Sequence, residues 1–422
     1  MASKLIFNRK RFFLVLFSFI IQCILGFFFG HQYDMGIFLT SGYIVAKGDV
    51  PYGLFPASQI FNHQGFFEIL PGLGYPPPWG LFLGLVYLIV YKPTSNIFVY
   101  NLAVKIPGIL ANIGLAFIME KIAIQEGIDK INSNRIFHFF LFNPYFIYIS
   151  AVWGQFDSVV IMLVILAINY LLHCKWIKSS VFVALATSLK IIPLLLFPMY
   201  LFYLRRNHKS LSSIKFVSTF VAANIILSYL PFKILNWDPG ILINNLDFHF
   251  NRAGCFTLFN IFDLLYGREK FPHGLEFLGY LWIPALVFLY YGLSKTKLEN
   301  RIDLLRWTSS IIFITILTRS WVSEQNIILL IPLMILPTLF YNKNWKTISL
   351  TWILPLIFSI INTSPFQMFF LISPRPLAFI RDLDIFMKFP RLLLKFLIVI
   401  PWQFLGWTYI IKSIRDSKKY AK

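Results

Sequence analysis

Long apolar runs recur along almost the whole chain, and most have the length that crosses a lipid bilayer. The run Phe12–Gly30 carries no charge, and the run Ile97–Met119 is interrupted only by Lys105. The chain is 58% hydrophobic and 13% charged, whereas soluble domains are about half apolar and about 25% charged. Because a spanning helix needs about 20 apolar residues, we predict an all-α polytopic membrane protein, a single domain over residues 1–422. Further spans are predicted near residues 136–152, 159–172, 213–231, 275–294, 304–318, 326–341, 347–361 and 392–411. With half-length pieces this gives about 10–13 transmembrane or half-membrane helices.

The connections between these runs are mostly short and basic. Lys and Arg gather before the first run and at residues 175–178, 205–209, 294–301, 342–346 and 412–422. Since cytoplasmic loops carry an excess of Lys and Arg, we predict that both termini are cytoplasmic and that residues 412–422 form a cytoplasmic tail. The net charge of +20 is then explained by loop orientation and attraction to anionic lipid, and nucleic acid is not an expected partner. The first run is too long for a cleavable signal, so it is interpreted as the first membrane anchor. We expect an integral, multi-pass protein of the cell membrane.

Two apolar pieces must not cross fully if the basic segments are to share one side. Pro76–Tyr91 is short and begins with proline, so we expect a juxtamembrane or re-entrant piece. Ser179–Leu204 is too short for two full spans but long enough for two half-helices broken around Lys190–Pro193, because proline breaks a helix. Irregular backbone at membrane depth is tolerated only against protein or a water-filled cavity, so a cavity is predicted near Lys190.

The first long loop, residues 31–79, is expected to be folded, with short juxtamembrane helices. Long loops are usually functional or disordered, and this one is rich in Trp, Tyr, Phe and Pro. Asp34 comes directly after the first apolar run, at the membrane boundary, where ionisable groups are costly and usually functional. The alternative is that Asp34 only solvates a helix end. Residues 231–274 form a second long extracytoplasmic loop in this topology.

Other polar residues are predicted at the same membrane side. Asp157, within WGQFDS, and Glu324 lie in outer turns and need counter-charges. Arg and Lys near lipid suit a lipid phosphate, although snorkelling to the interface is the alternative for the buried lysines. The stretch Phe248–Asn260 mixes aromatic rings with hydrogen-bonding groups that suit a sugar, but an interfacial aromatic belt has the same composition. The candidate cations are Lys105, Lys190, Arg252, Arg319, Arg375 and Arg381.

Several kinds of site have no support in the sequence. The seven histidines show no HxxxH or HExxH spacing, which disfavours a zinc site. The chain has three cysteines, Cys23, Cys174 and Cys255. Neither a disulfide framework nor a cysteine-based metal site is therefore expected. The chain has no GxGxxG, GxxxxGK[ST] or GxSxG motif, so soluble nucleotide binding and serine-hydrolase chemistry are not expected.

A set of short blocks resembles a known group of membrane enzymes. These are Pro51-Tyr52, Tyr75-Pro76-Pro77, WGQFDS after Asn143-Pro144, and Lys190 followed by Pro193. Together with Asp34 they are similar to the GT-C glycosyltransferases, and more closely to the polyprenol-phosphate-mannose-dependent mannosyltransferases of glycosyltransferase family 87 and the PIG-M-like enzymes. The resemblance covers residues 10–205 well and the rest in outline.

The resemblance implies an inverting hexosyltransferase, with mannose as the first choice of sugar. It would take the hexose from a polyprenyl-phosphate carrier and pass it to a hydroxyl of an extracytoplasmic glycan or glycolipid, with Asp34 as general base. No cofactor is expected, and metal independence is favoured because the outer turn offers Asp157 without a second acidic partner. Gln155, Asp157 and Glu324 are expected to hold the acceptor or brace the site, with a structural turn as the alternative. The donor phosphate is assigned to Lys105, Lys190, Arg252 and Arg319, and sugar or loop packing to Tyr52, Tyr75 and His249.

Two other functions remain open from the sequence. Broken helices and buried lysines also suit a polytopic transporter or a lipid flippase. A non-catalytic subunit of a membrane glycan assembly is the third possibility.

Overall fold

The computed structural model describes residues 9–56, 69–243, 252–296, 298, 300–342, 344–363, 365–372, 382–383 and 385–419. Its α-helices are α1 Arg9–Phe28, α2 Gln32–Ala46, α3 Pro77–Val86, α4 Lys92–Thr94, α5 Ile97–Gln125, α6 Lys130–Phe142, α7 Pro144–Ile147, α8 Asp157–Leu172, α9 Trp176–Leu189, α10 Phe197–Asn207, α11 Ser210–Asn224, α12 Leu230–Ile234, α14 Asn260–Tyr266, α15 Trp282–Ser294, α16 Arg301–Thr318, α17 Ile331–Asn342, α18 Trp345–Asn362 and α20 Lys388–Lys419.

Shorter elements join these helices. The 3₁₀ helices are η4 Ile192–Leu196, η6 Glu276–Tyr280, η7 Glu324–Leu329 and η8 Pro365–Met368, and the π-helices are η2 Tyr87–Tyr91, η3 Tyr148–Trp153 and η5 Ile225–Tyr229. Two small sheets complete the described part. Strand β1 (Leu54–Pro56) pairs antiparallel with β2 (Ile69–Pro71), and β3 (Gly254–Cys255) pairs parallel with β4 (Trp321–Val322).

The predicted fold class is confirmed: the chain is an all-α polytopic membrane protein. Among the described residues, seven helical segments are long and apolar enough to cross a membrane, and three shorter apolar helices accompany them. Only 11% of the apolar window in the segment Ser210–Ile234 is buried inside the protein. A helix that is apolar but unburied is suited to contact with lipid.

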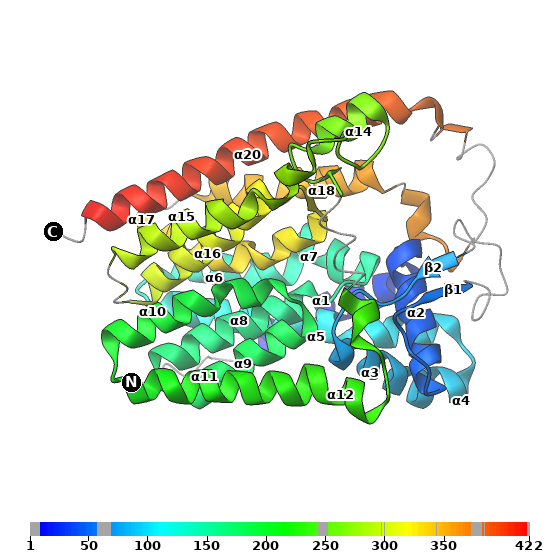
Figure 1. The fold of residues 1–422 in the computed structure, drawn as a ribbon, viewed down its shortest axis with the longest axis horizontal. Helices are drawn as coiled ribbons and strands as arrows, with labels where there is room; N and C mark the ends of the chain where they lie inside the picture. Colours follow the sequence, from blue (N-terminus) through cyan, green and yellow to red (C-terminus); the bar gives the residue numbers. More distant parts are fainter. Residues whose placement is uncertain are drawn as a thin grey trace.

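The elements expected near the membrane surface gather at one end of the bundle. Figure 1 shows α2, α3, α4 and the β1–β2 pair at the right, whereas the C-terminus and the connection between α10 and α11 lie at the left. Helix α2, which carries Asp34 in its first turn, is therefore at the opposite end of the bundle from the connection between α10 and α11. The helix Pro77–Val86 continues as the π-helix Tyr87–Tyr91 and stays at the right-hand end, so it does not traverse the bundle.

The predicted break around Lys190–Pro193 is present. Helix α9 ends at Leu189, and Lys190 has extended backbone angles (φ −150°, ψ 133°). A 3₁₀ turn with Pro193 follows, and α10 then returns to the left-hand end (Figure 1). The Lys190 side chain is buried at the C-terminal end of α9. At the C-terminus α20 runs unbroken to Lys419, so residues 412–419 continue the last helix.

Candidate functional site

Asp34 lies in the first turn of α2, immediately after the corner that follows α1. His31 caps this helix, and its Nδ1 atom accepts a hydrogen bond of 3.2 Å from the backbone N–H of Asp34. A negative charge in the first turn is favoured by the helix dipole. The local sequence therefore both starts the helix and fixes the position of the carboxylate.

Trp153 orients the Asp34 carboxylate by a hydrogen bond. Its indole N–H donates a hydrogen bond of 2.5 Å to Oδ2 of Asp34. The His31 ring stacks on the Trp153 ring with 4.2 Å between centroids and 12° between planes, and the His31 backbone N–H bonds the Trp153 carbonyl at 3.0 Å. The Asp34 side chain nevertheless keeps 20% of its surface exposed. It is thus oriented by protein groups but still open to a ligand.

Asp157 and Lys190 form a buried ion pair close to this carboxylate. The Lys190 Nζ atom lies 2.5 Å from Oδ1 of Asp157, and both residues are buried. The pair joins the start of α8 to the end of α9. Gly154, at φ 105°, makes the turn into α8 possible, because an added Cβ there would meet Met35 and Lys105.

Tyr75 connects the two acidic groups. Its hydroxyl donates a hydrogen bond of 3.5 Å to Oε1 of Gln155. Burial raises the pKa of Tyr75 well above its usual value, and the nearby charges of Asp34 and Asp157 raise it further. The structure therefore brings Asp34, Tyr75, Gln155, Asp157 and Lys190 together, and we call these five residues the acidic site.

Lys105 borders the acidic site but is bound to backbone carbonyls. Its Nζ atom donates to the carbonyl oxygens of Gly26 (3.3 Å), Phe29 and Val152 (3.5 Å). The helix C-terminus carries partial negative charge, so this ammonium group stabilises the end of α1. In the structure Lys105 supports the corner that presents Asp34.

A second buried polar group supports the same corner. Asn112 donates to Oε1 of Gln22 (2.8 Å), and its Oδ1 atom accepts from Ser158 (2.6 Å) and Ser150 (3.4 Å). All four residues are buried. Buried polar groups are costly unless hydrogen-bonded, and these bonds tie α1 and α5 to η3 and α8, the elements that carry Trp153 and Asp157.

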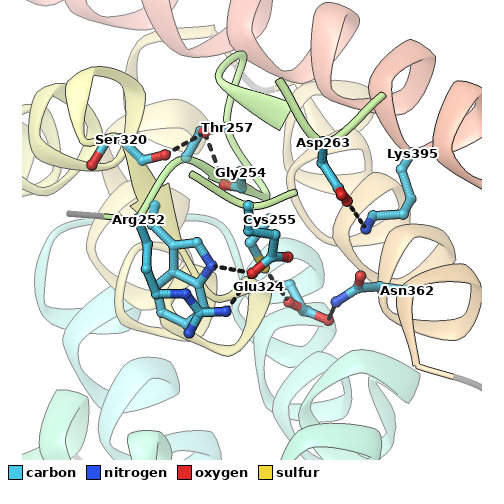
Figure 2. Close-up of polar contacts among 11 residues, drawn as sticks. Arg252, Gly254, Cys255, Thr257, Asp263, Ser320, Glu324, Asn362 and Lys395 are labelled. Carbon is cyan, nitrogen blue, oxygen red and sulfur yellow. Dashed lines mark hydrogen bonds and ion pairs between the residues drawn. The ribbon is translucent and has the colours of Figure 1, made fainter. Parts of the chain in front are cut away.

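Arg252 is paired with residues that lie elsewhere in the sequence. It forms an ion pair with Glu269 and lies over the Trp321 ring, 4.2 Å from the centroid. Trp321 also donates a hydrogen bond of 3.1 Å to Glu269. Figure 2 shows this group beside the β3–β4 pair. The charge of Arg252 is thus compensated by the Glu269 carboxylate.

Arg319 differs from the other three residues that the sequence assigned to the donor phosphate. It follows α16 directly and lines a cavity of about 10 Å³ together with Ile192 and Asn326. Room of this size suits roughly one water molecule. No described residue forms a hydrogen bond or an ion pair with its guanidinium group, and burial lowers the pKa of Arg319. The lining includes Ile192 but not Lys190, so the cavity expected at Lys190 stays a prediction.

Glu324 belongs to a separate buried cluster. Its carboxylate accepts hydrogen bonds from the Cys255 thiol (3.2 Å) and the Asn362 amide (3.1 Å), as Figure 2 shows. Burial raises the pKa of Glu324. Among the described residues, no hydrogen bond or ion pair links it to the acidic site. Tyr145 lies within electrostatic range of both Glu324 and Asp157, so the two clusters are neighbours, but the three carboxylates do not meet.

The remaining candidates are placed as follows. Tyr52 is buried and packs against Phe232 and Trp237, with ring centroids 5.5 and 5.8 Å away, which corresponds to loop packing. His249 falls outside the described residues, as do Arg375 and Arg381. Within the described ranges, no group of three His, Cys, Asp or Glu residues could hold a metal ion.

Sequence reasoning missed two residues of the site. His31 and Trp153 orient Asp34; His31 begins the first long loop, and Trp153 begins the WGQFDS block. The three-residue spacing of His31 and Asp34 across a helix start is the signal that could have identified the cap. The partnership with Trp153 joins residues 119 positions apart and has no local signal.

One family comparison gives a match. A family described as PIG-U, GPI transamidase subunit PIG-U, matches residues 77–262, which is less than half of the chain. The matched segment contains Gln155, Asp157 and Lys190 but neither Asp34 nor Arg319. A search of curated proteins gives no match. The chain is thus similar in part to a membrane protein family of the GPI pathway.

Proposed function

We propose that this protein is a GT-C-type glycosyltransferase that moves a hexose, with mannose as the first choice, from a polyprenyl-phosphate carrier to a hydroxyl of a glycan or glycolipid. The observation that carries the proposal is the Asp34 carboxylate. It is oriented by Trp153, remains 20% exposed and lies beside the buried pair of Asp157 and Lys190. The site would face the extracytoplasmic side of the cell membrane.

The proposed reaction is a single displacement. Asp34 accepts the proton of the acceptor hydroxyl as general base, and the acceptor oxygen attacks the anomeric carbon. The bond from that carbon to the phosphate oxygen breaks, and the polyprenyl phosphate leaves with the electron pair. One displacement inverts the anomeric centre. A retaining enzyme would instead need two carboxylates about 5 Å apart acting in two steps.

The phosphate is assigned to Arg319 within this proposal. Lys190 is neutralised by Asp157, Arg252 by Glu269, and Lys105 binds helix-end carbonyls. An arginine without a described partner can bind a phosphate through several N–H groups. Its cavity is also lined by Ile192, which follows Lys190 by two residues.

The test is transfer from radiolabelled polyprenyl-phosphate-mannose to a membrane glycolipid extract by the purified protein. Asp34→Asn should lose transfer by roughly 10²–10⁴-fold, the contribution of a general base, with unchanged thermal stability. Asp49→Asn is the matched control, because Asp49 is an exposed carboxylate in the same loop. Wild-type transfer rates in purified Asp34→Asn protein would reject the assignment.

A second candidate function rests on the family match. The matching family is described as a subunit of GPI transamidase, so we also consider a subunit that binds a lipid-linked glycan without transferring sugar. In that case the purified protein would bind the carrier lipid but release no labelled product, and Asp34→Asn would leave its role unaffected. The match gives no support to the transporter or flippase alternative.

A further inference from the structure

We propose that Gln155, Asp157 and Thr187 form a binding site for the hydroxyl groups of the transferred hexose, next to Asp34. This inference rests on the proposed function and deepens it. It assigns the buried pair of Asp157 and Lys190 to recognition of a neutral sugar ring rather than to the carrier phosphate.

Three buried polar atoms carry the inference. They are Nε2 of Gln155, Oδ2 of Asp157 and Oγ1 of Thr187, and none of them has a hydrogen-bond partner among the described residues. The residues are only 2%, 0% and 8% exposed, respectively. Buried polar side chains nearly always have a partner, so three such atoms in one region indicate that a ligand supplies the bonds.

The three atoms come from elements that meet at one place. The ion pair between Lys190 and Asp157 holds the end of α9 against the start of α8. Thr187 lies in the last turn of α9, three residues before Lys190, whose backbone N–H still bonds the Ala186 carbonyl at 3.0 Å. Gln155 lies two residues before Asp157, and its Oε1 atom is already taken by the Tyr75 hydroxyl. The Gln155 Nε2 atom keeps its two N–H donors without a partner among the described residues.

The chemistry of this set matches a polyol. A carboxylate oxygen accepts from a hydroxyl, an amide N–H donates to one, and a threonine hydroxyl does either. The charge of Asp157 is balanced by Lys190, so the site is close to neutral and does not favour a phosphate dianion. Hydrogen bonds to an ionised acceptor are stronger than neutral ones, which suits Asp157 to select one hydroxyl orientation.

Binding can be tested separately from transfer by working in the Asp34→Asn background. The probes are polyprenyl-phosphate-mannose, its glucose and galactose counterparts, and polyprenyl phosphate without sugar, measured by ligand-induced thermal stabilisation of purified protein. Thr187→Val keeps the shape and removes the hydroxyl, and Thr187→Ser keeps the hydroxyl.

We expect Thr187→Val to weaken binding of the preferred hexosyl carrier by roughly fivefold, the effect of one lost hydrogen bond. It should change the ranking of the three hexoses and leave sugar-free carrier binding unchanged, and Thr187→Ser should restore the ranking. An unchanged ranking in Thr187→Val, or an equal loss for the sugar-free carrier, would overturn the inference. If either contradicting result is found but Asp34→Asn still abolishes transfer, the sugar-site inference is wrong and the proposed glycosyltransferase function stands. If the wild type neither binds nor transfers any of the carriers, both fail.

Discussion

The indole N–H of Trp153 donates a hydrogen bond to Oδ2 of Asp34, across 119 positions of sequence. The same indole ring stacks on His31, the residue that caps the helix of Asp34. A single side chain thus fixes both the carboxylate and its cap. The other carboxylate oxygen has no such constraint from Trp153 and is the oxygen that we expect to receive a proton.

Trp153→Phe should lower transfer while leaving the fold intact. Phenylalanine keeps the stacking on His31 but lacks the N–H that orients Asp34. Loss of one hydrogen bond to a charged group costs about 1.5–3 kcal/mol, so we expect a fall in kcat of roughly tenfold to a hundredfold. The matched control is Trp79→Phe, because the Trp79 N–H has no partner among the described residues. Equal effects of the two substitutions would show that bulk, and not the hydrogen bond, matters at position 153.

The buried pair of Asp157 and Lys190 should dominate local stability. Lys190→Met leaves the Asp157 charge buried and unpaired, which we expect to cost about 3–5 kcal/mol in the free energy of unfolding. The double variant Asp157→Leu with Lys190→Met should recover much of that loss without recovering activity. Thermal unfolding in detergent measures both. Glu276→Gln, at an exposed ion pair with His273, should leave the Tm unchanged, and a double variant no more stable than Lys190→Met would contradict the pairing.

We predict that the stability of the folded protein depends on pH through His31. Burial lowers the pKa of His31, and the charge of Asp34 offsets this only in part. The unfolded chain therefore takes up a proton below about pH 6.5, before the folded protein does. Stability should be fully present above that pH and should fall as the pH drops toward the folded pKa.

The measurement is the Tm between pH 8 and pH 5. His31→Gln should flatten the dependence, whereas His273→Gln should not, because His273 is fully exposed. An identical pH dependence in His31→Gln and the wild type would assign the effect to another group.

Sequence reasoning succeeded where a feature is local. The length and uncharged character of Phe12–Gly30 predicted α1, and the proline beyond Lys190 predicted the broken helix, because both effects act within a few residues. The position of Asp34 at the end of an apolar run followed in the same way. The sequence predicts how far along the bundle axis a residue lies. It does not predict which neighbouring helices surround that residue. Asp157 and Glu324 were expected together for that reason and lie in separate clusters.

The role of Lys105 shows a second limit. A lysine within an apolar run has the same sequence signature whether it faces a phosphate or backbone carbonyls. Only the fold shows that the end of α1 reaches its Nζ atom. The choice among the four cations therefore depended on their partners, which are distant in sequence.

Arg319 gives the sharpest test of that choice. Because its guanidinium has no described partner, Arg319→Gln should leave the Tm close to that of the wild type and raise the KM for the polyprenyl-phosphate donor. We expect an increase of roughly tenfold or more, since a hydrogen bond to a charged group contributes about 1.5–3 kcal/mol. Arg319→Lys should keep part of the affinity through its charge but lose the fork geometry of the guanidinium. The control is Arg268→Gln, at an exposed arginine of the outer loop. A normal KM in Arg319→Gln, together with a raised KM in Arg252→Gln, would transfer the phosphate to Arg252 and require its ion pair with Glu269 to open during binding.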